Sequence, residues 1–392
     1  MINQNAQRLG QERSCIRELF EYGLARAKVV GKENIYDFSL GNPSIPAPQG
    51  VKDAILALLE EESSLSLHGY TTAAGLPATR KAIAKELTGR FSYEVLAENL
   101  FITGGAAPAL CAALKALQTE NSEVIALCPY FPEYKPFAQM ARQKFVTVEA
   151  KLPDLSLPLE GLEKAINANT AAVLINSPNN PSGVVYSKEN LEELACLLTR
   201  KGQELGHPIY LISDEPYREL VYDGTEVPFL PAIYKNTLIC YSYSKCLSLP
   251  GERIGYVYVN QFAENAEALY AAVAGAARAL GHVCAPSLMQ KVIARCASLG
   301  PDLSAYDKNR KALYEGLTAI GYEAVKPQGA FYLLVKAPGG DAKAFSEKAK
   351  QLDLLIVPGD DFGIPGYFRL CYCVDYEKIV GSLPLFQKLL QS

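Results

Sequence analysis

Residues 242 to 256 read SYSKCLSLPGERIGY, and this stretch decides how the rest of the chain is interpreted. Lys245 follows two serines, Ser242 and Ser244, and precedes Arg253 by eight positions. A lysine amine forms a reversible imine with an aldehyde, while hydroxyls and a guanidinium are groups that hold a phosphate. The run therefore points to pyridoxal phosphate, a cofactor that carries both groups. Taken alone, the run also fits a solvated surface turn.

Length and composition indicate a soluble globular protein with more than one core. The 392 residues exceed the size at which a single hydrophobic core keeps growing, so one large and one small domain, or two equal ones, are expected. Apolar residues make up 49% and charged residues 20%, which argues against disorder, a fibrous repeat or a membrane span. The net charge of −4 provides no basic field, so we expect neither nucleic acid nor membrane as a partner.

The ten cysteines are scattered, contain no CxxC pair and are interpreted as reduced core thiols. Cys371 and Cys373 are candidate metal ligands, but the chain has three histidines and none is spaced near them, so burial on one face of a strand is favoured. We therefore expect no metal. The first residues lack an apolar run long enough for a secretion signal, and we expect a cytoplasmic protein.

The order of the predicted elements favours an α/β fold. Helical spacing covers residues 14–31, and a proline-rich connection, NPSIPAP, follows at residues 42–48. Helices then alternate with short apolar runs, which predicts a largely parallel sheet with helices on both faces. The predicted strands are residues 99–103, 124–127, 171–175, 209–212 and 237–241, and helices are predicted at 78–87 and 189–201.

Past residue 286 the pattern changes to helices that flank a small sheet, with strands near residues 330–335 and 367–371 and a last helix from Tyr376. We predict three segments: residues 1–47 as an N-terminal arm and part of a small domain, 48–285 as the large cofactor-binding domain, and 286–392 as the C-terminal small domain.

Two polar clusters come directly after predicted strands, where ligands of open α/β sheets bind. NSPNNPSG, residues 176–183, is a tight turn that can aim Asn180 inward, although asparagines that bond their own backbone explain it equally well. YLISDEPYREL, residues 210–220, ends its strand with Asp214, and Tyr217 follows. A carboxylate there is costly unless paired, and a protonated pyridine nitrogen is a fitting partner. Alternatively, Asp214 caps a helix that starts at Pro216, or it pairs with a nearby arginine.

Three further clusters suit a phosphate, a flat ring and a carboxylate. FITGGAAPALCAAL, residues 101–114, predicts a strand, a Gly-Gly turn and a helix whose free amides bind a monophosphate. CPYFPEY, residues 128–134, offers a ring that stacks on a cofactor or simply packs. Arg369, in GYFRLCYC at residues 366–373, is a cation on an apolar strand and requires an anion there. Either a substrate carboxylate binds it, or it forms a structural salt bridge.

With these clusters in this order, the chain resembles the class I/II aminotransferases, the fold type I pyridoxal phosphate enzymes that include aspartate aminotransferase. The resemblance implies a large domain with a mostly parallel sheet between helices and a smaller α+β domain. It implies that Lys245 forms the imine with the cofactor, that Asp214 pairs with the ring nitrogen, and that Asn180 and Tyr217 bond the phenolic oxygen. Phe131 takes the stacking position. Gly105 and Ala106 resemble the phosphate-binding amides, and Ser242, Ser244 and Arg253 supply phosphate-binding side chains.

The resemblance also extends to the substrates and to a partner subunit. Gly41 in SLGNPS, Asn180 and Arg369 match groups that bind the substrate α-carboxylate. Tyr70, in HGYTTAAGLPATRKAIA, is similar to the tyrosine that reaches the phosphate of the neighbouring subunit, which implies a homodimer. The implied reaction moves an amino group between an L-amino acid and a 2-oxo acid, with Lys245, Asp214 and Tyr217 in the catalytic group.

Two departures limit this comparison. PGER, residues 250–253, replaces the usual residues before the phosphate arginine, and no residue matches the second arginine of dicarboxylate-specific members. Substrate identity therefore stays open. A carbon–sulfur β-lyase or another carbanion-forming enzyme on this scaffold is the alternative function. A non-catalytic, cofactor-binding regulatory module is a more distant one, which the retained Lys245 and Asp214 and the missing basic DNA-binding segment disfavour.

Overall fold

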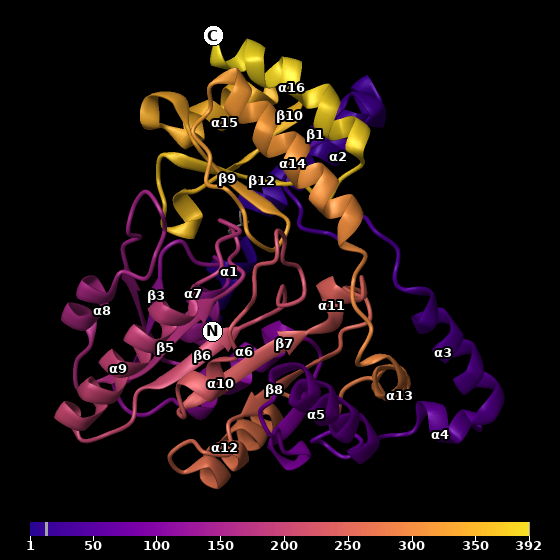
Figure 1. Cartoon of the computed structure of the whole chain (residues 1–392), viewed down its shortest axis with the longest axis vertical. Helices are drawn as coiled ribbons and strands as arrows, with labels where there is room; N and C mark the ends of the chain where they lie inside the picture. Colours follow the sequence, from indigo (N-terminus) through magenta and orange to yellow (C-terminus); the bar gives the residue numbers. More distant parts are fainter. Residues whose placement is uncertain (12–14, 392) are drawn as a thin grey trace.

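The computed structural model describes residues 1–11 and 15–391. A seven-stranded sheet forms the lower part of the molecule in Figure 1, with the strand order β2-β8-β7-β6-β5-β3-β4. All neighbours pair in parallel except β8, which is antiparallel to both β2 and β7. The strands are β2 (Leu100–Thr103), β3 (Glu123–Leu127), β4 (Lys144–Val148), β5 (Thr170–Asn176), β6 (Tyr210–Asp214), β7 (Thr237–Ser242) and β8 (Gly255–Val259).

Helices cover both faces of this sheet because its strands are apolar on both sides. Along β5, Val173 packs in one hydrophobic cluster with Leu194 of α9, whereas the next residue, Leu174, packs in another with Leu110 of α6 and Val273 of α12. Successive strand residues point to opposite faces, so a continuous apolar run needs cover on both. The helices around the sheet are α5 (Pro77–Phe91), α6 (Ala106–Ala116), α7 (Tyr134–Met140), α8 (Leu159–Ala165), α9 (Lys188–Leu205), α10 (Leu230–Ile233), α11 (Tyr243–Cys246) and α12 (Ala266–Ala279).

A second group of elements lies above the large sheet in Figure 1 and joins the two ends of the chain. Its three-stranded antiparallel sheet has the order β11-β12-β9, and a separate two-stranded parallel sheet pairs β1 with β10. The members are α2 (Cys15–Val30), β1 (Tyr36–Asp37), α14 (Leu303–Ile320), β9 (Tyr332–Lys336), α15 (Ala342–Lys350), β10 (Leu354–Leu355), β11 (Val357–Pro358), β12 (Tyr367–Cys371) and α16 (Tyr376–Leu390).

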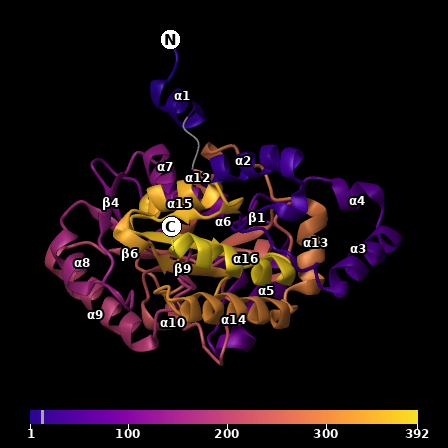
Figure 2. The same cartoon turned by 90° about the horizontal axis from the view of Figure 1, so that it is seen from above.

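The remaining helices lie at the margins. α1 (Gln4–Gln11) has no buried residue and extends away from the body of the molecule, as Figure 2 shows. Helices α3 (Gln49–Glu61) and α4 (Ser64–His68) project on one side, and α13 (Ser287–Cys296) packs against α3 and α5. Short 3₁₀ turns are η1 (Lys32–Asn34), η2 (Ala97–Asn99), η3 (Pro338–Gly340) and η4 (Asp360–Phe362).

The predicted α/β architecture is confirmed, with some differences in detail. All five predicted strands of the large sheet are present, and β4 and β8 are two further strands that were not predicted. The helix predicted for residues 14–31 is α2, and residue 14 lies outside the described residues. No helix begins at Pro216, where a turn stands instead, so Asp214 does not cap one. In the described residues, no helix is long and apolar enough to cross a membrane.

Candidate active site

One pocket of about 560 Å³ lies where the carboxyl ends of the parallel strands face the C-terminal sheet. It brings together most of the predicted site residues. Those that line it are Gly41, Ala106, Phe131, Asn180, Asp214, Tyr217, Ser242, Ser244, Lys245, Arg253 and Arg369. Gly105 lies directly beside it, whereas Tyr70 is 89% exposed and does not line the pocket of its own chain.

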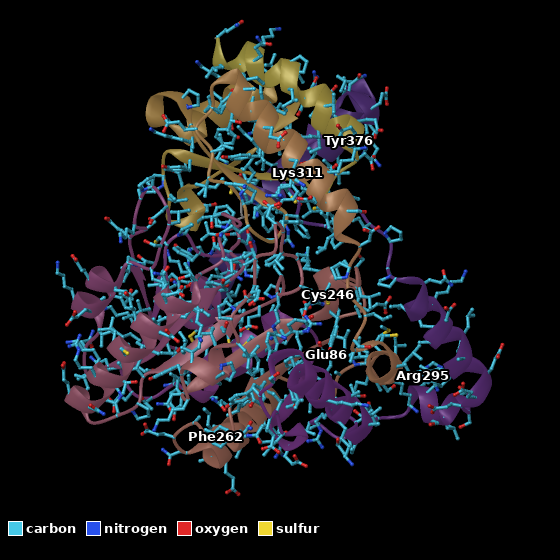
Figure 3. All side chains as sticks on the ribbon, viewed as in Figure 1. Glu86, Cys246, Phe262, Arg295, Lys311 and Tyr376 are labelled. Carbon is cyan, nitrogen blue, oxygen red and sulfur yellow. The ribbon has the colours of Figure 1, made fainter. Side chains whose placement is uncertain are left out.

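Lys245 enters the pocket from α11, the short helix that follows β7. Ser242 caps this helix by accepting a hydrogen bond from the Ser244 amide, and Cys246, labelled in Figure 3, is its last residue. The Lys245 amine donates a hydrogen bond to the Gly41 carbonyl at 2.6 Å. Burial lowers the pKa of Lys245, so its neutral, nucleophilic form becomes more accessible.

Asp214 ends β6 with one carboxylate oxygen bonded and the other free. Tyr134 donates a hydrogen bond of 2.6 Å to Oδ2, while Oδ1 is buried and has no partner among the described residues. Burial raises the pKa of Asp214 to about 7, and the neighbouring Glu215 charge adds to the rise. A buried acceptor without a partner is costly, so this oxygen is poised for a donor that enters the pocket.

The turn after β5 connects Asp214 to the substrate side of the pocket. Asn176 donates to the Asp214 carbonyl at 2.8 Å and accepts from the Asn180 amide at 2.7 Å. The side chain of Asn179 accepts a hydrogen bond from the Ser182 amide and so stabilises the turn. The side chain of Asn180 is thereby left to accept from Arg369 Nη1 at 3.1 Å.

Arg369 is a buried cation on β12 without an anionic partner. Its Nη2 donates to the Ser39 carbonyl, its Nε has no partner, and it forms no ion pair with a carboxylate in the described part of the chain. The guanidinium carbon lies 4.8 Å from the ring centre of Tyr332 and 5.1 Å from that of Phe362. The structural salt bridge considered above is therefore not formed, and a ligand carboxylate would supply the missing charge.

Hydroxyls, a guanidinium and a helix start gather at the opposite end of the pocket. Arg253 donates to Ser244 Oγ at 3.4 Å, and the Ser242 and Ser244 hydroxyls lie 2.6 Å apart. Gly105 precedes α6 with a φ of 100°, and a Cβ there would lie 2.6 Å from Arg253 Nη2. Only glycine suits both the backbone and the close approach of the guanidinium. The free amides of α6 and Arg253 together suit a phosphate.

Tyr134, Tyr332 and Arg17 also belong to the site, although none of them was predicted as a site residue. Tyr134 bonds Asp214, and its ring meets that of Phe131 edge to face, with centres 5.7 Å apart. Tyr332 bonds the Tyr217 hydroxyl at 2.9 Å. Arg17 of α2 lines the pocket mouth. Tyr134 stood inside the aromatic cluster already noted, but no local signal marks the other two, because the folded chain brings them in from its two ends.

Comparison with known proteins agrees with this geometry. The family model "Aminotransferase class I and II" matches residues 33–380. The chain belongs to the class I and II aminotransferases. A relative in Thermus thermophilus, an aspartate/prephenate aminotransferase, is 31% identical over 89% of each chain. An aspartate aminotransferase of Pyrococcus horikoshii is 29% identical over 97% of this chain and 95% of its own.

Solved structures of aminotransferases have the same fold. An aminotransferase from Eubacterium rectale is 54% identical with a TM-score of 0.98, and the match covers 100% of this chain and 98% of the other. The Thermus thermophilus aspartate aminotransferase solved with maleate is 28% identical with a TM-score of 0.87 and full coverage of both chains. This aminotransferase is thus a fold type I enzyme that moves an amino group between an amino acid and a 2-oxo acid.

Class I/II aminotransferases use pyridoxal phosphate, and the pocket of this enzyme fits that cofactor. The free Oδ1 of Asp214 suits a ring N–H, and the hydroxyls with Arg253 suit the phosphate. The described residues contain no cluster of three histidines, cysteines or acids able to hold a metal ion.

Proposed function

We propose that Lys245 is the lysine that binds the cofactor and then moves the proton at the substrate α-carbon. When bound, pyridoxal phosphate supplies an electron sink for the charge that develops on that carbon. The lowered pKa of Lys245 supports this role, because a base must be neutral to accept a proton. Asp214 would hold the ring nitrogen protonated, and Tyr217, with its partner Tyr332, would donate to the phenolic oxygen together with Asn180.

The same proposal assigns the ends of the bound cofactor and substrate. Gly105, Ala106, Ser242, Ser244 and Arg253 would hold the phosphate, and Phe131 would cover one face of the ring. Arg369 with Asn180 and Gly41 would bind the substrate α-carboxylate. The observation that carries the proposal is the buried Arg369 guanidinium, which shares one pocket with Lys245 and forms no ion pair with a carboxylate in residues 1–11 and 15–391.

A half-reaction tests this function. The enzyme loaded with cofactor is mixed with one amino acid and no oxo acid, and its absorption spectrum is recorded. We expect the imine band to convert to the amine form with one oxo acid released per site. A band that persists while product accumulates catalytically would instead indicate a lyase.

For the substrate class, we propose dicarboxylic amino acids and oxo acids, held at the second carboxylate by Arg17. Arg17 is exposed at the pocket mouth and makes no hydrogen bond or ion pair among residues 1–11 and 15–391. Two supports come from relatives, which are named aspartate aminotransferases, one of them solved with the dicarboxylate maleate. An arginine can bind a carboxylate through its positive charge and two parallel hydrogen bonds, which suits recognition of a second substrate carboxylate.

Arg17→Gln tests the substrate class. We expect kcat/KM for aspartate to fall about 10- to 100-fold, or about 1.4–2.7 kcal/mol, with alanine changing less than about twofold. Glu133 lines the same pocket, so Glu133→Gln should shift the preference toward aspartate. Lys28→Gln, on the exposed part of the same helix, is the control. An equal loss for both amino acids would contradict the role of Arg17.

We also propose a cytoplasmic homodimer in which Tyr70 completes the neighbouring phosphate site. Tyr70 is 89% exposed and does not line the pocket of its own chain. It follows α4, and the exposed apolar residues Leu56, Leu59 and Leu65 stand nearby in sequence on α3 and α4. Exposed apolar groups gathered on projecting helices support association with a second chain. Ten free cysteines accord with a reducing compartment.

A further inference from the structure

Two cysteines beside the substrate pocket have no part in the proposed transamination. Cys371 ends β12 and Cys373 follows two residues later. Both are free and buried, with exposed fractions of 0% and 4%. Their sulfur atoms lie 2.8 Å apart. A disulfide bond measures about 2.05 Å, so the two sulfur atoms lie about 0.8 Å beyond bonding distance.

The pair is tied to the segment that closes the substrate side of the pocket. Arg369, Cys371 and Cys373 alternate along the chain, as residues on one face of a strand do. The carbonyls of residues 39, 40 and 41 accept, in that order, from Arg369 Nη2, Cys373 Sγ at 3.8 Å and Lys245 Nζ at 2.6 Å. One short segment thus connects the thiol pair to Arg369 and Lys245.

The two thiols differ in reactivity. Burial opposes ionisation of Cys371, but the hydrogen bond from Cys373 and the charges of Arg369 and Lys245 outweigh it and lower the pKa of Cys371. Burial and the neighbouring sulfur raise the pKa of Cys373 well above its usual range. A thiolate with a thiol in contact is the arrangement of an attacking and a resolving cysteine.

We propose that Cys371 and Cys373 form a reversible disulfide when the enzyme meets a hydroperoxide, and that this bond reduces transamination. The Cys371 thiolate attacks one oxygen of hydrogen peroxide, and the O–O bond breaks. Hydroxide departs as the leaving group, and Cys371 becomes a sulfenic acid. Cys373 then attacks that sulfur and displaces its hydroxyl group, which departs with the thiol proton as water. Two thiols thereby give two electrons to one peroxide, and the hydroxide, with the proton that Cys371 had released, makes the second water.

The bond changes the site through the backbone contact. Once Cys373 is oxidised, its single S–H, which the Cys371 sulfur and the Leu40 carbonyl share, is lost, and the Cys371 thiolate no longer faces Lys245 and Arg369. The segment from residue 39 to 41 then keeps its bonds from Arg369 and Lys245 and loses the one from Cys373. We expect kcat/KM for the amino donor to fall at least about tenfold, mainly through a higher KM.

The test uses the holoenzyme and hydrogen peroxide. After treatment, remaining thiols are alkylated and the protein is digested with trypsin, which cuts after Arg369 and Lys378 and so releases both cysteines in one peptide, LCYCVDYEK. We expect this peptide to escape alkylation and to weigh about 2 Da less than its reduced form. Dithiothreitol should restore both the alkylation and the activity.

Single variants separate this pair from the other cysteines. Cys371→Ser and Cys373→Ser should each keep their own untreated activity after peroxide, whereas Cys196→Ser, at the exposed cysteine, should lose activity as the native enzyme does. The proposal is overturned if the peptide is alkylated as before, if it gains oxygen without forming the bond, or if the bond forms and activity stays unchanged. The mass readout is independent of whether the enzyme transaminates.

Discussion

At the scale of single residues, the site depends on polar groups that are buried without a complete set of partners. Among the described residues, Asp214 Oδ1 and Arg369 Nε have no hydrogen-bond partner, and Arg369 forms no ion pair with a carboxylate. Burying such groups costs stability, because they lose water and no protein partner replaces it. A bound cofactor and substrate would supply these partners, so the same groups that lower the stability of the fold give the site its affinity.

We predict that Asp214→Asn slows proton transfer at the α-carbon at least about 100-fold. The amide keeps the shape of the side chain and its contact with Tyr134 but cannot hold a ring nitrogen in its protonated form. Single-turnover absorbance with one amino acid measures the step, and circular dichroism checks the fold. A single-turnover rate equal to that of the native enzyme would contradict the role.

The raised pKa of Asp214 predicts a pH dependence of stability for the enzyme without cofactor. Between about pH 4 and pH 7 the folded protein holds a proton that the unfolded chain has released, so stability falls as pH rises through this window. From pH 5 to pH 8 the loss from this carboxyl is about 3 kcal/mol.

Asp214→Asn should remove that loss. Thermal unfolding of both apo proteins at pH 5 and pH 8 would therefore show the variant gaining stability relative to the native protein at the higher pH. Native holoenzyme is the control, since a cationic ring partner would cancel the difference. If the variant gained the same stability at both pH values, the pH dependence would not come from a raised pKa of Asp214.

At the scale of elements, the strands that hold the site could be predicted, and the contacts between them could not. β5, β6 and β7 are apolar runs whose last residues are polar, so both their position and the residues Asn176, Asp214 and Ser242 at their ends follow from sequence. β4 is an edge strand, KFVTV, with only its last residue buried, and its pattern is too polar to be recognised. β8 pairs antiparallel with both neighbours, a direction that its own residues do not encode.

We predict that Gly105→Ala weakens cofactor affinity at least about tenfold. The added Cβ would require a φ of 100° in a non-glycine residue and would press on Arg253 Nη2, so the turn before α6 and the guanidinium move together. Gly104→Ala is a matched control, since its Cβ would meet Pro108 and the Arg253 carbonyl only at 3.8 and 3.9 Å. Cofactor titration followed by absorbance compares the two variants. Equal affinities would contradict the role of Gly105 in holding the phosphate.

At the scale of the whole molecule, the pocket is assembled from parts of the chain that are far apart. Ser39 and Gly41, close to the N-terminus, accept hydrogen bonds from Arg369 and Lys245. Arg17 and Tyr332 also reach the pocket from distant segments, and for this reason the sequence alone did not identify them. The predicted boundaries after residues 47 and 285 stay a prediction, although the pairing of β1 with β10 already connects the first segment to the last.

We predict that mixed dimers complement each other if Tyr70 serves the neighbouring site. Chains carrying Lys245→Ala are combined with chains carrying Tyr70→Ala, each almost inactive alone. In the mixed dimer one site has both Lys245 and Tyr70, so about half of the native activity per mixed dimer should return. Activity that stays at the level of the separate variants would exclude a shared site, and light scattering reports whether dimers form.

Covalent trapping identifies the lysine that binds the cofactor, which we propose is Lys245. Borohydride reduction of the holoenzyme fixes the bond between the lysine and pyridoxal phosphate, and peptide mass mapping then finds the modified residue. We predict that the label is on the peptide that contains Lys245, at one per chain, and that Lys245→Ala abolishes it. A label on another lysine, or a labelled Lys245→Ala protein, would contradict this account.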